Sequence, residues 1–399
     1  MAFSKSAVIS VKRIEKRGAL AHWQNESVDA SDDQPANGHA IYLHCDVDKM
    51  YYSVEALETP SLADETRAVI IGIDPRHYAR GIVTTANGVA RSIGISSGMS
   101  NAIATRIARE RGVDVVFVAP RHDVYAAYSR RLMDLLRTET PLLEQRSIDE
   151  AALDWRHNRF ETEPVVRLRQ RILHEIGLSV SFGLAPSLLV AKMASEVAKA
   201  REDHVCVVRP GEAAAFLAPL SVRALVGIGP KSEARLRVFD LSTIGDLATR
   251  PLDWLVDEFG SAYGRYLYRA SRGEDDSTLV GERAGKSISA EHTFNRDTGD
   301  RAEIWLRLQA QAQDVAARLQ DEHLVAGEVA IKVRYGVTWE TITRQQRLGS
   351  PTDEHAVLAA GAAALMRKAW TRRPIRLIGL RASKLEPKPD SVQLPLLSS

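Results

Sequence analysis

The 399-residue chain has little of what secreted and membrane proteins rely on. Its only two cysteines, Cys45 and Cys206, cannot build a disulfide framework and do not have the spacing of a zinc site. No apolar run approaches the roughly 18 to 20 residues that cross a bilayer, and the N-terminus has no signal-peptide pattern. These absences predict a protein of the reducing cytoplasm that does not contact a membrane.

Net charge is also nearly absent, because 53 lysines and arginines stand against 51 aspartates and glutamates. The overall balance therefore says nothing about nucleic acid, but the distribution is uneven. Residues 331–384 carry eleven basic and three acidic side chains, a local net charge of +8. Such a cluster is the feature expected of a phosphate-binding surface, and the alternative is an ordinary solvated face.

Two short acidic segments, Asp46-Val47-Asp48 and Asp149-Glu150, each lie in an apolar stretch with the pattern of a β-strand. An ionised carboxylate on a buried strand is costly unless a positive charge neutralises it. Mg²⁺ is typically held by one or two carboxylates plus substrate phosphates, and two ions about 3.5 to 4 Å apart stabilise both oxygens of a phosphoryl displacement. The two segments therefore indicate nucleotidyl transfer.

Alternation of apolar and polar residues predicts a strand over 40–46, with Asp46 on the face opposite the apolar one. Successive strand residues point to opposite faces, so Asp149 and Glu150 both reach one site only where a turn or bulge interrupts the strand. Further patterns predict strands over 69–73, 113–118, 178–182, 204–208, 329–335 and 375–380, and helices over 124–136, 166–176, 302–319 and 355–370. This mixed order indicates an α+β protein.

Three strings occur in order along the chain: the run from Asp46 to Glu55, the run from Arg80 to Asn87, and the segment 147–151 (Ser-Ile-Asp-Glu-Ala). Together they resemble the Y-family translesion DNA polymerases, most closely the DNA polymerase IV (DinB) branch. The resemblance extends from Ile41 to Lys384. It implies a template-directed, low-fidelity DNA polymerase that extends primers past damaged bases.

The resemblance also implies a right-hand architecture with an α+β palm, small fingers, a helical thumb containing a helix-hairpin-helix turn, and a C-terminal α/β little finger domain. The expected boundaries are a flexible N-terminal extension over 1–38, palm over 39–55 and 118–208, fingers over 56–117, thumb over 209–280, a linker over 281–285, the little finger over 286–386, and a tail over 387–399.

The active site that the resemblance implies is built on carboxylates. Asp46, Asp149 and Glu150 are the expected catalytic residues. With the backbone carbonyl of Val47 they are expected to hold two Mg²⁺ ions, for which Mn²⁺ is the expected substitute. The alternative is a set of ordinary surface carboxylates at strand ends.

The incoming deoxynucleoside triphosphate has its own expected contacts. Tyr51 matches the steric gate, an aromatic ring that clashes with a ribose 2′-hydroxyl but leaves room for deoxyribose. Thr85, Arg91 and Lys192 match positions that contact the triphosphate, where cationic donors offset developing negative charge.

Three positions depart from the family pattern. Gly88 stands where relatives often carry a tyrosine that bonds the phosphates. Residues 187–188 lack a lysine that is often present, and residues 199–202 replace a Lys-Pro-Asn-Gly turn. We therefore expect weaker nucleotide binding but retained activity.

Primer-template DNA is the expected macromolecular substrate of a monomeric protein. The turn containing Gly227 and Gly229 resembles a helix-hairpin-helix, whose glycines allow the backbone to approach a phosphate, with Lys231 beside it. The alternative is a simple connector between helices. Lys332 and Arg334, in the basic C-terminal region, are further expected DNA contacts.

The extreme C-terminus resembles the clamp-binding peptide of bacterial replication and repair proteins. In such peptides a glutamine makes hydrogen bonds and leucines fill an apolar pocket on the replication sliding clamp. The matching residues are Gln393, Leu394, Leu396 and Leu397. The alternative is a disordered tail with accidental leucines.

Three rival functions are less consistent with the sequence. A non-catalytic, polymerase-like adaptor at lesions would be expected to lose its metal carboxylates, and this chain has all three. A nucleotide cyclase can place two carboxylates on a palm-like sheet, but it has no use for the hairpin turn or the basic C-terminal region. A pure DNA-binding module leaves Tyr51 unexplained.

Overall fold

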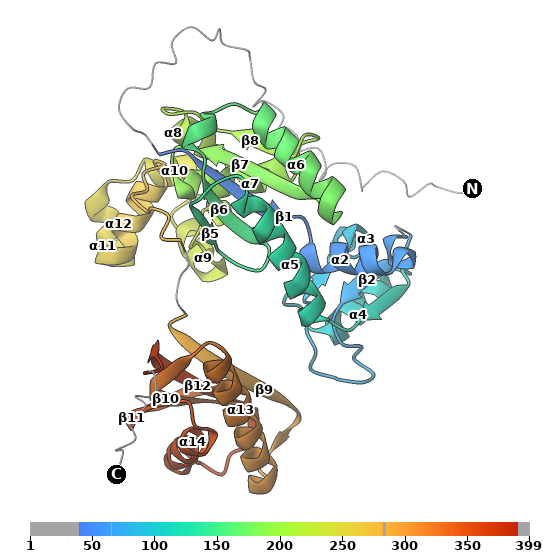
Figure 1. Ribbon diagram of the computed structural model, residues 1–399, viewed down its shortest axis with the longest axis vertical. Coiled ribbons are helices and arrows are strands. Elements are labelled where there is room, and N and C mark those ends of the chain that lie inside the picture. Colours follow the sequence, from blue (N-terminus) through green and yellow to red (C-terminus); the bar gives the residue numbers. More distant parts are fainter. Residues whose placement is uncertain (1–39, 65, 282–284, 390–399) are drawn as a thin grey trace, which may run out of the picture. The chain divides into compact units, whose positions relative to one another are not determined.

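The computed structural model describes residues 40–64, 66–281 and 285–389 (Figure 1). The chain forms two compact units, one comprising the chain up to Thr66 together with Pro120–Glu282, the other Arg67–Ala119 together with the chain from Arg283 onward. The expected N-terminal extension and the clamp-binding peptide lie outside the described residues. Within the described ranges, no helix is long and apolar enough to cross a membrane.

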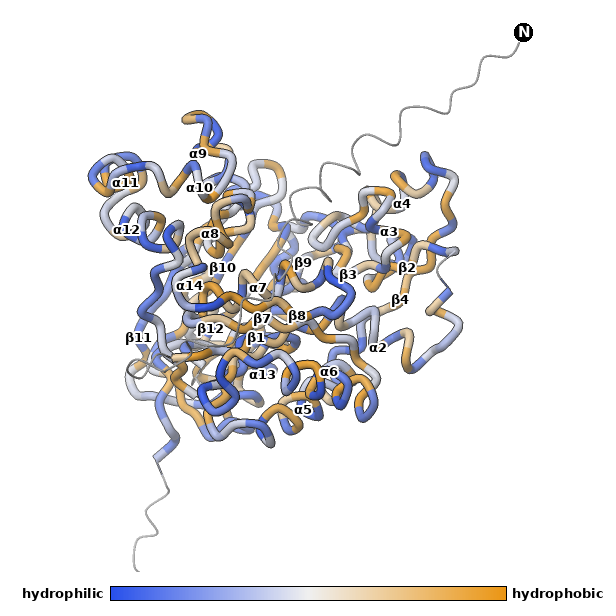
Figure 2. The backbone as a smooth tube through the Cα atoms, turned by 90° about the horizontal axis from the view of Figure 1, so that it is seen from above, coloured by the Kyte–Doolittle hydropathy of each residue, from blue (hydrophilic) through white to orange (hydrophobic). Residues whose placement is uncertain are grey.

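The first unit is built on a five-stranded sheet with the strand order β5-β6-β1-β7-β8. Central strand β1 is antiparallel to both of its neighbours, β6 and β7, whereas β8 runs parallel to β7. All residues of β1 and β7 are buried, and β7 is visibly hydrophobic (Figure 2). The strands are β1 (Tyr42–Val47), β5 (Leu143–Gln145), β6 (Glu150–Asp154), β7 (Val180–Ala185) and β8 (Val205–Val207).

Helix α7 (Leu188–Ala198) lies against β1, β7 and β8. It begins at Ser187, whose hydroxyl accepts a hydrogen bond from the N–H of Val190, so the serine at this departure from the family pattern acts as a helix cap. The helix approaches β7 closely at Gly183, where a Cβ atom would lie 2.0 Å from the carbonyl oxygen of Ala191. Other helices around the sheet are α2 (Met50–Glu58), the 3-10 turn η1 (Pro60–Ala63), α5 (His122–Arg137) and α6 (Glu163–Ile176); the 3-10 turn η2 (Arg156–Asn158) follows β6.

The remainder of the first unit is helical and corresponds to the thumb. Leu236, Ile244 and Leu267 are buried in the same cluster as Val190 and Ala194 of α7, so the thumb shares a core with the palm sheet. The elements are α8 (Ala213–Leu217), the 3-10 turn η3 (Val222–Ala224), α9 (Pro230–Arg237), α10 (Ile244–Ala248), α11 (Leu252–Phe259) and α12 (Ser261–Ala270).

The second unit contains two sheets. The smaller has the order β3-β2-β4, with β2 antiparallel to β3 and parallel to β4. It consists of β2 (Ala68–Ile71), β3 (Thr85–Ala86) and β4 (Val115–Val118), with helices α3 (Gly88–Ser92) and α4 (Asn101–Glu110). A small apolar core, including Ala68, Val83, Ile95 and Ala104, holds this fingers region together.

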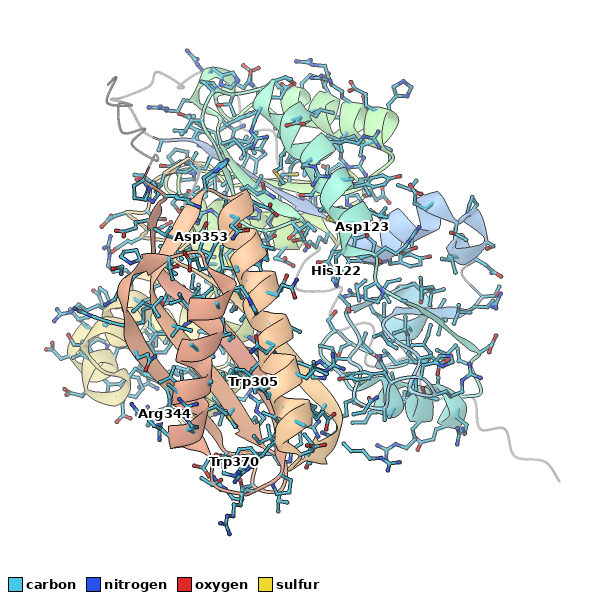
Figure 3. The ribbon with its side chains drawn as sticks, turned by 60° about the horizontal axis from the view of Figure 1, so that its bottom comes forward. His122, Asp123, Trp305, Arg344, Asp353 and Trp370 are labelled. Carbon is cyan, nitrogen blue, oxygen red and sulfur yellow. The ribbon has the colours of Figure 1, made fainter. Side chains whose placement is uncertain are left out.

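The larger sheet is the antiparallel little finger sheet, with the order β11-β10-β12-β9. Helices α13 and α14 lie side by side on one face of it, as Figure 3 shows from the helical side. Its elements are β9 (Ser287–Thr298), α13 (Arg301–Asp321), β10 (Leu324–Tyr335), β11 (Thr341–Thr352), α14 (His355–Ala369) and β12 (Ile375–Pro387). The expected α+β right-hand architecture is confirmed in its palm, fingers, thumb and little finger.

Candidate active site

The two acidic segments lie next to each other on neighbouring strands. Asp46 of β1 is the register partner of Glu150 of β6, and the N–H of Val47 donates to the carbonyl of Asp149 at 3.0 Å. Asp149 lies in the bend before β6, and Glu150 is the first residue of that strand. The interruption expected between Asp149 and Glu150 is therefore present, and the four residues of the predicted metal site are neighbours along the backbone of the two strands.

The alternating pattern placed Asp46 on the polar face of its strand, but in the structure that face is not open to solvent. Helix α7 covers this face, and only 4% of the residue is exposed. Burial raises the pKa of Asp46 to about 7, and the nearby ammonium of Lys199 opposes that rise. The Nζ atom of Lys199 lies 2.9 Å from the carboxylate and 2.7 Å from Glu196. Lys199 was not among the expected site residues.

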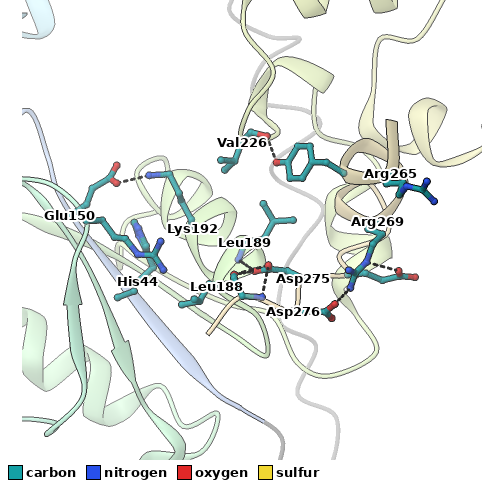
Figure 4. Close-up of a pocket in the computed structure, with 15 residues that line it drawn as sticks. His44, Glu150, Leu188, Leu189, Lys192, Val226, Arg265, Arg269, Asp275 and Asp276 are labelled. Carbon is teal, nitrogen blue, oxygen red and sulfur yellow. Dashed lines mark hydrogen bonds and ion pairs between the residues drawn. The ribbon is translucent and has the colours of Figure 1, made fainter. Parts of the chain in front are cut away.

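Glu150 is neutralised in the same way by Lys192, whose Nζ atom lies 2.5 Å from the carboxylate (Figure 4). Lys192 was expected at the triphosphate, and here it pairs with a predicted metal ligand. Asp149 accepts a hydrogen bond from the hydroxyl of Ser147 at 2.5 Å. The two lysines therefore neutralise two of the three carboxylates, Glu150 and Asp46.

The residues fit a magnesium site in their chemistry. Three carboxylates and a backbone carbonyl are hard oxygen donors of the kind that Mg²⁺ prefers, and desolvated Asp46 requires a nearby positive charge. Among the described residues, however, no three histidine, cysteine, aspartate or glutamate side chains are grouped closely enough to form a ready-made metal site.

Asp48 supports the end of β1. Its carboxylate accepts hydrogen bonds from the hydroxyls of Ser179 at 2.8 Å and Ser181 at 2.9 Å, and it lies 3.1 Å from Nδ1 of His204. These contacts tie the strand end that carries Asp46 to strand β7 and the segment before β8.

Tyr51 rests on a rigid aromatic support. Its ring stacks on Tyr125, with centroids 4.4 Å apart and planes 16° apart, and meets His122 edge-on. The hydroxyl of Tyr125 donates to buried Glu55 at 2.6 Å, and the guanidinium of Arg121 donates to both oxygens of the same carboxylate. Sequence reasoning missed this support, although Glu55 closes the string that carries the resemblance.

In the fingers, the predicted triphosphate contacts lie together. The Nη2 atom of Arg91 donates to the Thr85 hydroxyl at 3.2 Å, and its Nε atom donates to the carbonyl of Ala86 at 2.9 Å. Gly88 is the first residue of α3. Asn87 caps this helix, because its side-chain oxygen accepts a hydrogen bond from the N–H of Ala90. That these residues act with the palm carboxylates stays a prediction.

A cavity of about 650 Å³ is lined by Glu150 and Lys192 of the palm and by Val226 and Arg265 of the thumb (Figure 4). His44 lines it and bonds the hydroxyl of Ser195 through Nδ1 at 2.9 Å. Burial, with the charges of Lys192 and Arg146, lowers the pKa of His44 to about 3, so this imidazole is neutral. The basic residues lining the cavity are Arg146, Lys192, Arg265 and Arg269.

The predicted DNA-contact residues of the thumb lie at the start of α9. Gly227 is exposed and has φ near +85°, the left-handed region that favours glycine. Gly229 is the N-cap of α9, and Lys231 is an exposed residue of its first turn.

Lys332 and Arg334 lie on the face of the little finger sheet that the helices leave open. Lys332 pairs with Glu291 at 2.8 Å, and the Nε atom of Arg334 donates to the hydroxyl of Thr341 at 2.8 Å. The register places Arg381 and Arg347 on the same face, beside a cavity of about 370 Å³ that Lys332 and Arg381 line. The eleven basic residues do not share this surface, however, since Arg367 and Lys368 lie on helix α14.

Comparisons with known proteins agree with this architecture. Residues 45–196 match the model of the impB/mucB/samB family, residues 285–396 match its C-terminal domain, and residues 223–275 match the thumb domain described for DNA polymerase-iota. DNA polymerase IV of Methanoculleus marisnigri is 36% identical over 88% of this chain and 95% of its own length. That of Halorhodospira halophila is 36% identical over 87% of this chain and 95% of its own.

Solved structures support the same fold. A Y-family DNA polymerase chimera, 24% identical, matches with a TM-score of 0.76 over 87% of this chain and 99% of its own. DinB from Sulfolobus solfataricus, 23% identical, matches with a TM-score of 0.58 over 86% of this chain and 98% of its own. The chain therefore belongs to the Y family of translesion DNA polymerases, in its DNA polymerase IV branch. The family and enzyme class expected from the sequence are confirmed.

Proposed function

We propose that this chain adds deoxynucleotides to a primer 3′ end by two-metal-ion nucleotidyl transfer, and that it does so opposite damaged template bases. The observation that carries the proposal is the pairing of Asp46 with Glu150 beside the bend that holds Asp149. These carboxylates converge from two strands that are distant in sequence, and one of them is buried.

In this proposal Asp46, Asp149, Glu150 and the carbonyl of Val47 hold two Mg²⁺ ions, with Mn²⁺ as a substitute. When bound, the ions activate the primer hydroxyl and neutralise the triphosphate and its leaving group. The side chains supply the oxygen ligands and fix them on a rigid sheet.

The two lysines would have a second role in a metal-bound site. In this structure Lys192 neutralises Glu150 and Lys199 neutralises Asp46. If metal ions took over that role, both ammonium groups would be available to offset the charge of a triphosphate. This exchange reconciles the pairing of Lys192 seen here with its expected role at the triphosphate.

Nucleotide selection is assigned to two further groups. Tyr51, held flat on Tyr125, excludes a ribose 2′-hydroxyl by its bulk. Thr85 and Arg91 of the fingers contact the triphosphate, and Gly88 between them offers no side chain to the phosphates.

Primer-template DNA is proposed to bind along the thumb turn and the open face of the little finger sheet. One structural neighbour is described as an insertion ternary complex of Dbh DNA polymerase, which is consistent with DNA and nucleotide as substrates here. We further propose that Gln393, Leu394, Leu396 and Leu397 tether a monomeric polymerase to the sliding clamp in the cytoplasm.

A primer-extension assay with and without Mg²⁺ tests the proposal, using Asp149→Ala and Glu150→Ala. Both variants are expected to lose extension while binding primer-template DNA as the wild type does. Asp154→Ala is the matched control, because Asp154 lies on the same face of β6 but pairs with Arg156. Full extension by either site variant would contradict the metal assignment, and Mg²⁺-independent extension would contradict the mechanism.

A further inference from the structure

The hairpin turn of the thumb is held by two tyrosines from another helix. The hydroxyl of Tyr263 donates to the carbonyl of Gly227 at 3.0 Å, and that of Tyr266 donates to the carbonyl of Val226. Both tyrosines project from α12, some 36 and 40 residues further along the chain. Two successive carbonyls of the turn are therefore engaged by side chains that are remote in sequence.

A third carbonyl is engaged in the same way. The guanidinium of Arg223 donates to the carbonyl of Ile228, and the same side chain lies 3.7 Å from the carboxylate of Glu233 on α9. Three consecutive backbone oxygens, from residue 226 to residue 228, thus each accept a side-chain donor. Turns normally leave such oxygens to water.

The tyrosine rings form a rigid surface under the turn. Tyr263 and Tyr266 stack with centroids 6.0 Å apart and planes 16° apart. A Cβ atom on Gly227 would lie 3.2 Å from the ring of Tyr266, so the turn backbone sits directly against it. Burial also raises the pKa of Tyr266 to about 12.

The electrostatic effect of these bonds favours an anion. Carbonyl oxygens carry partial negative charge and repel a phosphate, whereas the N-terminus of a helix attracts one. Because the three oxygens accept hydrogen bonds from side chains, their negative charge is partly neutralised. The start of α9, with Gly229 as N-cap and exposed Lys231 beside it, is then the part of the turn that attracts an anion. The bonds therefore orient the turn as well as stabilise it.

The position of the turn matters because it borders the reaction centre. Val226 and Tyr266 line the same 650 Å³ cavity as Glu150 and Lys192, together with Arg265 of α12 (Figure 4). A displaced turn would shift any strand lying in this cavity relative to the carboxylates. We infer that Tyr263 and Tyr266 are positioning residues that hold the hairpin turn where it meets the backbone of the primer-template. The inference rests on the proposed function, since it takes that DNA as the ligand.

Phenylalanine substitutions test the inference, because they remove the hydroxyls and keep the stacked rings. We expect the double variant Tyr263→Phe/Tyr266→Phe to bind primer-template DNA about tenfold more weakly in the absence of nucleotide, and each single variant less so. Loss of one phosphate contact would also reduce the slope of log Kd against log salt by about 0.9.

Tyr268→Phe is the matched control, since Tyr268 lies on the same helix with its ring over Arg272, 3.6 Å from the guanidinium carbon. Thermal melting of each variant separates loss of folding from loss of positioning. An unchanged Kd in the double variant, or an equal loss in Tyr268→Phe, would overturn the inference. Because binding is measured without nucleotide, a wild type that binds DNA but does not extend it would count against the proposed function alone.

Discussion

Replacing Lys199 by methionine removes the cation nearest to Asp46 and keeps the length of the side chain. The ammonium and the carboxylate lie 2.9 Å apart, and their side chains are 32% and 6% exposed. The change leaves a desolvated carboxylate without its partner in the metal-free protein. It therefore measures how strongly the site requires a positive charge.

The size of the effect follows from the exposure of the two groups. Removing one partner of a fully buried ion pair costs about 3 to 5 kcal/mol. Lys199 is about a third exposed, so solvent screens part of the interaction, and we expect a loss of about 1 to 2 kcal/mol in stability. Since Mg²⁺ would replace the missing charge, saturating Mg²⁺ should restore most of the loss.

The assay is thermal melting of four proteins, each with EDTA and with MgCl₂: wild type, Lys199→Met, Asp46→Asn and the double variant. In the Asp46→Asn background the lysine substitution should cost little, because no buried charge remains to be neutralised. Glu196→Gln is the control, since it removes the other partner of Lys199 and leaves Asp46 paired. An equal loss with and without Mg²⁺, and in both backgrounds, would refute the reasoning.

Four further outcomes are expected. Tyr51→Ala should raise the ratio of ribonucleotide to deoxyribonucleotide incorporation, whereas Tyr52→Ala should not; an unmoved ratio would place the gate elsewhere. Gly183→Ala should lower both the melting temperature and extension, because its Cβ would lie 2.0 Å from the backbone oxygen of Ala191 and push α7, with Lys192, off the sheet; normal melting would show that the helix yields without cost. The N–H groups of Thr243 and Ser242 help hold the pKa of Asp246 below its usual range. The contribution of Asp246 to thumb stability is therefore present at neutral pH and lost as the pH falls through that lowered pKa. The melting temperatures of wild type and Asp246→Asn should differ at pH 7 and converge in acid, and a constant difference would contradict this. Deleting Gln393 to Ser399 should leave distributive extension on a short primer intact and remove stimulation by the sliding clamp, and equal stimulation of both proteins would refute the tether.

Local pattern was sufficient for much of the framework. The predicted helices over 124–136, 166–176, 302–319 and 355–370 correspond to α5, α6, α13 and α14, because each has an apolar stripe at helical spacing. Strand β1 and the bend between Asp149 and Glu150 were expected from the alternation of side chains along a strand. Strands β9 and β11 were not predicted, since they are edge strands of the little finger sheet whose residues are largely exposed and lack a strong apolar alternation.

The sequence by itself determined the strings that identify the family, and with them the predicted metal carboxylates and the predicted gate residue Tyr51. Only the tertiary structure decided how they are supported: that α7 covers Asp46 and brings Lys199 to it, that Tyr125 lies under Tyr51, and that Tyr263 reaches the carbonyl of Gly227. The physical reason is that helix and strand periodicity fixes which face a residue occupies on its own element. Which partner that face meets depends on how elements far apart in the chain pack together, and no local pattern encodes it.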